Sequence, residues 1–183
     1  RVSADIQSEI DSTADPDTAA QMLKDAQLAQ WRNKAISDTY EPGSTFKIIT
    51  LAIALEEGAA TPSDSFYCGG SMTVQGRGKP LKCWKTTGHG SQNLTQAIQH
   101  SCNVALVQIG QLIGARTFYK YAEAFGFLNL TSNVDSNLTA KTGIDMSGES
   151  GSIWWSQNTF YDTENLSQLA AASFGQTFTI TPL

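Results

Sequence analysis

The chain has 183 residues, 40% of them hydrophobic, and a formal net charge of -5 at pH 7. This length can bury one sizeable core, and no break in composition divides the sequence, so we expect a single domain over residues 1–183. The mildly acidic charge, without a dense run of lysine and arginine, argues against a surface that binds nucleic acid.

The N-terminal part is polar, and we expect residues 1–14 to be irregular. Asp15 followed by Pro16 is typical of an N-cap and a first helical position, which predicts a packing helix that ends near Gln30. Trp31 should close this helix near a neighbouring surface, and an extended segment should follow to residue 39. The predicted apolar stripe of the helix consists of Met22, Leu23, Ala26 and Ala29.

Ser44 and Lys47 stand at the start of a second helix, which follows a Pro-Gly turn and is apolar on nearly all sides until Gly58. Ser44 alone is typical of an N-cap. A capping box, however, needs Glu or Gln three residues later, and a lysine is unfavourable there because burial and the helix dipole both disfavour its charge. Positions i and i+3 share a helix face, so the Lys47 amine should reach the Ser44 hydroxyl. This predicts a serine nucleophile activated by a lysine base of lowered pKa.

Residues 66–74 and 81–84 flank a loop with two glycines and a proline, which predicts a hairpin. Cys68 and Cys83 would lie on opposite arms and are candidates for a cross-strand disulfide bond. Together with Cys102 they are too few for a disulfide scaffold. They also lack the paired C-x-x-C spacing of a zinc site, so we expect no metal and no cofactor.

Ser101 and Asn103 belong to a polar triplet between a short helix capped by Asn93 and a strongly apolar helix. A serine and an amide can project from such a junction into a cleft, although both are also ordinary linker residues. We interpret the intervening Cys102 thiol as inert and His89, which lies between two glycines, as a turn residue.

The last part of the chain begins with a helix over residues 115–125, which we interpret as core packing, and a polar surface loop over residues 128–138. Lys141, Thr142 and Gly143 then spell K-T-G. Because no apolar residues alternate around them, we predict a loop there rather than a strand.

Ser-x-x-Lys at 44–47 and Ser-x-Asn at 101–103, 57 residues later, resemble the motifs of penicillin-binding proteins in order and spacing. Residues 31–33, 142–149 and 173–183 also resemble segments of the class B members of this family. The resemblance implies an α+β fold, namely the mainly helical portion of a penicillin-binding protein or serine β-lactamase-like transpeptidase fold, with a small β-hairpin and an incomplete sheet. The third motif, Lys-Thr/Ser-Gly, would follow Leu183, so residues 1–183 would form a single incomplete transpeptidase domain.

The same resemblance implies roles for individual residues. Ser44 would be the nucleophile and Lys47 its base, Ser101 would relay the proton toward the leaving amine, and Asn103 would hold the substrate. The substrates would be D-Ala-D-Ala stem peptides of peptidoglycan, and β-lactam antibiotics would acylate the serine. The parent protein would be membrane-anchored at the extracytoplasmic face of the bacterial cell membrane, with cell-wall synthesis proteins as further partners. The fragment itself would be inactive or slow.

Three alternatives remain open from the sequence. A secreted β-lactamase would need a carboxylate for deacylation, and Glu149 is the candidate with a local motif. A β-lactam sensor would only bind the drug. A catalytically silent helical scaffold would keep the helices for packing alone.

Overall fold

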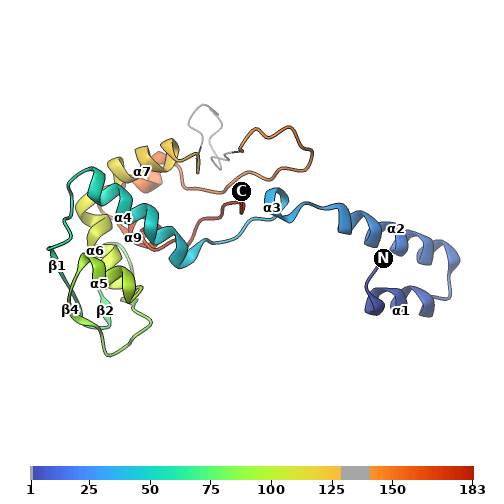
Figure 1. Cartoon of the computed structure of the whole chain (residues 1–183), viewed down its shortest axis with the longest axis horizontal. Helices are drawn as coiled ribbons and strands as arrows, with labels where there is room; N and C mark the ends of the chain where they lie inside the picture. Colours follow the sequence, from blue (N-terminus) through green and yellow to red (C-terminus); the bar gives the residue numbers. More distant parts are fainter. Residues whose placement is uncertain (1, 129–140) are drawn as a thin grey trace.

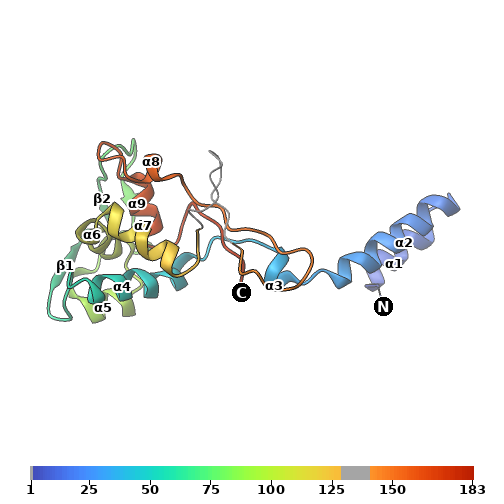
Figure 2. The ribbon, with the colours of Figure 1, turned by 90° about the horizontal axis from the view of Figure 1, so that it is seen from above.

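The computed structural model describes residues 2–128 and 141–183 (Figure 1). Most elements gather at one end of the molecule around helices α4 and α6. A pair of helices, α1 and α2, projects at the other end, and both views show this elongated shape (Figure 2). Among the described residues, no helix is both long enough and apolar enough to cross a membrane.

Helix α1 (Ala4–Ser12) occupies part of the segment that we expected to be irregular, and that prediction was wrong. The Ser3 side chain caps the helix by accepting a hydrogen bond from the Ile6 N–H. Ile10 is buried, and α1 packs against α2. Capping and one apolar contact therefore suffice to order a segment with a weak hydrophobic pattern.

Helix α2 (Pro16–Trp31) confirms the predicted start, because the Asp15 side chain accepts a hydrogen bond from the Thr18 N–H. None of its residues is buried, and Trp31 is 79% exposed. The expectation that Trp31 closes against a neighbouring surface was therefore wrong. One helical turn, α3 (Lys34–Ser37), follows where we expected an extended chain.

The predicted helix around Ser44 is confirmed. It begins as a 3-10 turn, η1 (Gly43–Phe46), and continues as α4 (Lys47–Glu56). Gly58 follows with a φ of +61°, the left-handed conformation that commonly ends a helix.

The predicted hairpin is only partly present. Strand β2 (Ser71–Met72) pairs with β3 (Leu81–Lys82), but β1 (Ser65–Cys68) pairs antiparallel with β4 (Gly90–Asn93). Gly70, with a φ of +91°, separates β1 from β2. Cys68 therefore lies opposite Gly90 rather than on a common ladder with Cys83, and the predicted cross-strand cysteine pair was wrong.

Helix α6 lies at the centre of the core, with its residues from Val104 to Val107 nearly inaccessible to solvent. An aromatic cluster packs beside it, in which the ring centroids of Trp154 and Phe178 are 4.2 Å apart and those of Phe46 and Phe178 are 4.8 Å apart. The remaining helices are α5 (Leu94–Gln99), α6 (Asn103–Ile113), α7 (Ala115–Ala124), α8 (Gln157–Phe160) and α9 (Ser167–Ala172).

The α+β class is confirmed, with two small antiparallel ladders beside a mainly helical body. The capped short helix α5 and the packing helix α7 also appear where the sequence predicted them. Of the predicted surface loop over residues 128–138, residues 129–138 lie outside the described part of the chain, and Leu128 is buried.

Candidate active site

The structure brings Ser44, Lys47, Ser101 and Asn103 into one hydrogen-bond network. The Lys47 Nζ donates to the Ser101 carbonyl oxygen at 2.7 Å, to the Ser101 Oγ at 2.9 Å and to the Asn103 Oδ1 at 2.7 Å. The Ser101 Oγ in turn donates to the Ser44 Oγ at 3.1 Å. Helix α4 and the junction between α5 and α6 thus place their polar groups around one lysine.

The direct contact that we predicted between Lys47 and Ser44 is replaced by an indirect one. An ammonium group has three donors, and the Ser101–Asn103 segment accepts all three. Within the described residues, Lys47 makes no hydrogen bond to Ser44. The Ser101 hydroxyl instead lies between the two side chains and connects them.

Lys47 is 1% exposed, although it carries a charge in its ordinary state. Burial lowers the pKa of Lys47 from its ordinary value of 10.5 to about 8, while nearby Cys83 and Cys102 act weakly in the opposite direction. Roughly a tenth of the lysine is then neutral at pH 7. A neutral amine has a lone pair, so this group can accept a proton near physiological pH.

Ser101 adopts a backbone φ of +49°, which non-glycine residues rarely do. The strain is offset by backbone hydrogen bonds on both sides, from the Ser101 N–H to the Ile98 carbonyl oxygen and from the Cys102 N–H to the Ala97 carbonyl oxygen, each at 3.0 Å. This left-handed turn lets the carbonyl and hydroxyl of Ser101 both face Lys47. The sequence carried no signal of it.

Gly175, in the segment after α9, supports the turn that carries Ser44. The Gly43 N–H donates to the Gly175 carbonyl oxygen at 2.7 Å, and a Cβ on Gly175 would lie 2.0 Å from the Gly43 carbonyl oxygen. The Thr50 Oγ1 also donates to the Ser173 carbonyl oxygen at 3.0 Å, which fixes the same segment to α4. Sequence reasoning assigned no role to these contacts.

An open groove of about 590 Å³ extends from Asn103 along β3 and the segment after α9. Three cationic residues line it, and Phe174 and Gln176 contribute to the opposite wall. The cations are Arg77, Lys79 and Lys82. The groove therefore favours an anionic ligand beside the hydrogen-bond network.

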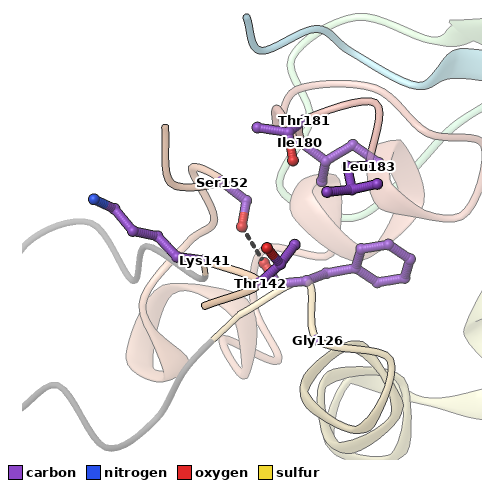
Figure 3. Close-up of a pocket in the computed structure, with 8 residues that line it drawn as sticks. Gly126, Lys141, Thr142, Ser152, Ile180, Thr181 and Leu183 are labelled. Atoms are coloured by element: carbon purple, nitrogen blue, oxygen red, sulfur yellow. Dashed lines mark hydrogen bonds between the residues drawn. The ribbon is translucent and has the colours of Figure 1, made fainter. Parts of the chain in front are cut away.

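Lys141, Thr142 and Gly143 have no regular secondary structure, which confirms the predicted loop. Figure 3 shows Thr142 at a small pocket, with the Lys141 side chain directed away from it. The Thr142 N–H and Oγ1 both donate to the Glu149 carboxylate, which lowers the pKa of Glu149. In the part of the chain that the structure describes, the hydrogen bonds of this carboxylate come from its own loop.

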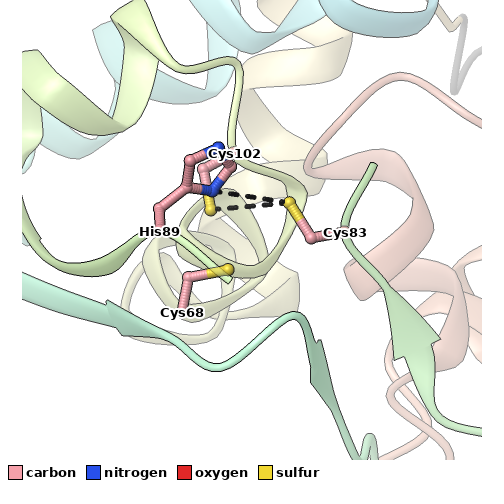
Figure 4. Close-up of side chains that lie close together, drawn as sticks. All are labelled: Cys68, Cys83, His89 and Cys102. Carbon is pink, nitrogen blue, oxygen red and sulfur yellow. Dashed lines mark hydrogen bonds between the residues drawn. The ribbon is translucent and has the colours of Figure 1, made fainter. Parts of the chain in front are cut away.

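The three cysteines are free and buried, so the disulfide bond that we considered between Cys68 and Cys83 is not present. The Cys83 Sγ instead lies 3.9 Å from the Cys102 Sγ and 3.7 Å from the His89 Nδ1 (Figure 4). Burial raises the pKa of the Cys102 thiol to about 12, in keeping with a protonated group. Motif spacing failed to reveal this cluster because its members come from four separate segments.

Comparison with known proteins identifies one protein family. Residues 7–183 match the penicillin-binding protein transpeptidase domain. Stage V sporulation protein D of Bacillus subtilis is 40% identical over 153 residues, which cover 83% of this chain and 21% of that protein. The chain thus spans about a fifth of the length of this relative.

Two solved structures are similar at 28% sequence identity each. The D,D-transpeptidase domain of a peptidoglycan glycosyltransferase from Eggerthella lenta superposes with a TM-score of 0.64, covering 85% of this chain and 34% of that one. Penicillin-binding protein A of M. tuberculosis, solved as a ceftriaxone acyl-enzyme complex, gives a TM-score of 0.61 and covers 94% of this chain and 36% of that one.

Proposed function

The chain belongs to the family of penicillin-binding protein transpeptidase domains, and we propose that it carries the nucleophile of a serine-type peptidoglycan D,D-transpeptidase. The observation that carries this proposal is the hydrogen-bonded series from Ser44 through Ser101 to the buried Lys47. Each member is within proton-transfer distance of the next, and Lys47 has the lowered pKa that a base requires.

Acylation begins when the Ser44 Oγ attacks the carbonyl carbon of the penultimate D-alanine of a stem peptide. The Ser44 proton passes to the Ser101 Oγ, whose own proton passes to the neutral Lys47 amine. The C–N bond then breaks, and the proton returns by the same route to the departing D-alanine amine. A stem peptide is thereby left as an ester on Ser44, and an amino group of a second stem takes the acyl group in the next step.

Substrate binding involves Asn103 and the adjacent basic groove. The Asn103 Oδ1 is occupied by Lys47, which leaves its Nδ2 to donate to a carbonyl oxygen of the stem peptide. The cations of the groove suit the carboxylates of such a peptide. In this proposal the protein acts on stem peptides outside the cytoplasmic membrane. β-Lactams acylate the same serine because they present a comparable carbonyl group.

A serine β-lactamase or a β-lactam sensor is the second candidate. A β-lactamase needs a carboxylate that activates water at the ester, and the Glu149 carboxylate is hydrogen-bonded to Thr142 within its own loop. This contact favours the transpeptidase. A β-lactam sensor does not transfer the acyl group from the serine to an amino group of a second stem peptide. Only a measurement of turnover on stem peptides therefore separates the sensor from the transpeptidase.

The test is the intact mass of the protein after incubation with penicillin. We expect a long-lived adduct of one drug molecule in the complete parent protein, its loss in Ser44→Ala, and its retention in Ser8→Ala, a matched change on exposed α1. Rapid release of hydrolysed drug would favour the β-lactamase. An adduct that survives in Ser44→Ala would refute the assignment of Ser44 as the nucleophile.

We also propose that the 183-residue chain alone acylates slowly. Acyl transfer needs two backbone donors at the developing oxyanion, and the loss of one costs about 10²–10³ in rate. One donor would be the Ser44 N–H, and the other would come from a strand with the Lys-Thr/Ser-Gly motif, which we place beyond Leu183. Equal labelling of this chain and of a version extended through that motif would contradict the proposal.

A further inference from the structure

Four metal-ligating side chains converge beside the hydrogen-bond network. The thiols of Cys68, Cys83 and Cys102 and the imidazole of His89 each direct one potential ligand atom to a common point, and all four atoms lie within 4.8 Å of one another. The three cysteines are buried and His89 is half-buried. Figure 4 shows them arriving from different segments, with no acidic residue among them.

The separations agree with the edges of a tetrahedron around zinc. Zinc binds cysteine sulfur at about 2.3 Å and histidine nitrogen at about 2.0 Å, so tetrahedral angles place two sulfurs about 3.8 Å apart and a sulfur and a nitrogen about 3.6 Å apart. The observed distances are 3.9 Å between the Cys83 and Cys102 sulfurs and 3.7 Å between the Cys83 Sγ and the His89 Nδ1. Two of the six separations therefore match the edges of a zinc tetrahedron, and the other four do not exceed 4.8 Å.

The backbone fold explains why these residues meet. Cys68 is the last residue of β1 and pairs with Gly90, which places the adjacent His89 beside it. Gly88 makes this approach possible, because its φ is +78° and a Cβ would lie 2.2 Å from the Cys68 carbonyl oxygen. Cys83 follows β3, and Cys102 is the N-cap of α6.

The His89 ring is also fixed in its plane. It stacks on His100 with ring centroids 5.0 Å apart and an interplanar angle of 5°, and Trp84 contacts it edge-on at 5.3 Å. A ligand held by stacking loses little freedom when it binds a metal. Three thiolates and one imidazole, moreover, form a donor set typical of closed structural zinc sites.

We propose that Cys68, Cys83, His89 and Cys102 bind one structural zinc ion. Binding releases the protons of the three thiols and forms three Zn–S bonds and one Zn–N bond, with no change in oxidation state. Cys102 stands between Ser101 and Asn103, the two residues that accept hydrogen bonds from Lys47. The ion would thus anchor the segment that carries the strained Ser101 turn.

The test is metal binding by the full chain, purified under reducing conditions. We expect one zinc per chain by elemental analysis. After zinc removal, Co²⁺ titration should give saturable absorption of a tetrahedral thiolate complex, and zinc should raise the melting temperature. Cys83→Ser should lower the affinity for Co²⁺ by more than about 100-fold, since even outer-shell changes cost 10- to 100-fold. The matched control, His100→Asn, alters the stacked ring but removes no ligand and should keep the stoichiometry.

Two results of the Co²⁺ titrations would overturn the zinc site. One is the absence of saturable Co²⁺ absorption in the reduced wild-type chain, a measurement that needs no variant to fold. The other is wild-type affinity in Cys83→Ser, with unchanged helical content by circular dichroism. A chain purified without reductant that shows one reactive thiol instead of three, and no metal, would assign the cluster to a disulfide and also refute the proposal.

Discussion

Replacing Lys47 by methionine removes a buried charge while keeping a side chain of similar length. The pKa of Lys47 lies about 2.5 units below its ordinary value of 10.5. At about 1.4 kcal/mol per unit, keeping the ammonium in the fold costs at most about 3.5 kcal/mol of unfolding free energy. The replacement also leaves the Ser101 and Asn103 oxygens without their donor, a loss of about 1–3 kcal/mol for each buried group. The two effects oppose each other at neutral pH.

The dependence of the unfolding free energy on pH separates the cost of the buried charge from the loss of hydrogen bonds. Between about pH 8 and pH 10.5 the unfolded lysine holds a proton that the folded lysine lacks, so wild-type stability rises with pH. The cost of the charge accumulates as pH falls through this window and is complete below pH 8. The methionine variant has no such group, whereas titrating residues that do not interact with Lys47 contribute to both proteins and cancel in the difference.

Urea denaturation at several pH values, in one metal-free buffer, measures this difference. We expect the wild type to gain up to about 3.5 kcal/mol relative to Lys47→Met between pH 8 and pH 10.5, and we expect penicillin acylation of the complete protein to be lost in the variant. Parallel stability profiles would refute the lowered pKa. Acylation that persists in the variant would refute the assignment of Lys47 as the base.

The other predictions concern the relay and the packing around it. Ser101→Ala should lower the acylation rate of the complete protein by at least about 10²-fold and the free energy of unfolding by about 1–3 kcal/mol, because the buried Lys47 loses one of its three acceptors, and an unchanged rate would exclude the relay. Gly175→Ala should destabilise the fold by more than about 2 kcal/mol, because its Cβ would overlap the Gly43 carbonyl oxygen, and thermal unfolding at the wild-type temperature would contradict that contact. Phe178→Ala should cost about 3–5 kcal/mol in urea denaturation, since Phe178 is 2% exposed within the aromatic cluster, and a loss below 1 kcal/mol would mean that the cluster repacks.

Features set by neighbouring residues could be predicted from the sequence. Asp15 before Pro16, the capping box of Asn93 and the glycine after α4 all fix helix ends through contacts within a few residues. The proximity of Ser44 to Lys47 was visible for the same reason, because their spacing of three is a local geometric property, but the predicted direct contact is mediated by Ser101.

Features set by distant residues could not be predicted. The pairing of β1 with β4 depends on how residues 69–89 fold back, and a periodic pattern does not report this. The cysteine and histidine cluster follows from that pairing and was missed with it. The insertion of Ser101 between Lys47 and Ser44 depends on a backbone conformation that a serine in a sequence does not signal.

The occupied amide oxygen of Asn103 gives the site a directional preference. Because the Oδ1 accepts a hydrogen bond from Lys47, this oxygen faces the lysine, and the side chain presents its Nδ2 donors to an incoming ligand. A ligand that presents a carbonyl oxygen there is matched, whereas one that presents an N–H meets another donor and leaves both groups unpaired. An unpaired buried polar group costs about 1–3 kcal/mol, so a peptide bond of reversed direction would bind about 5- to 150-fold more weakly. In the proposed mechanism, the lysine that activates the serine would thereby also select the orientation of the backbone that the serine attacks.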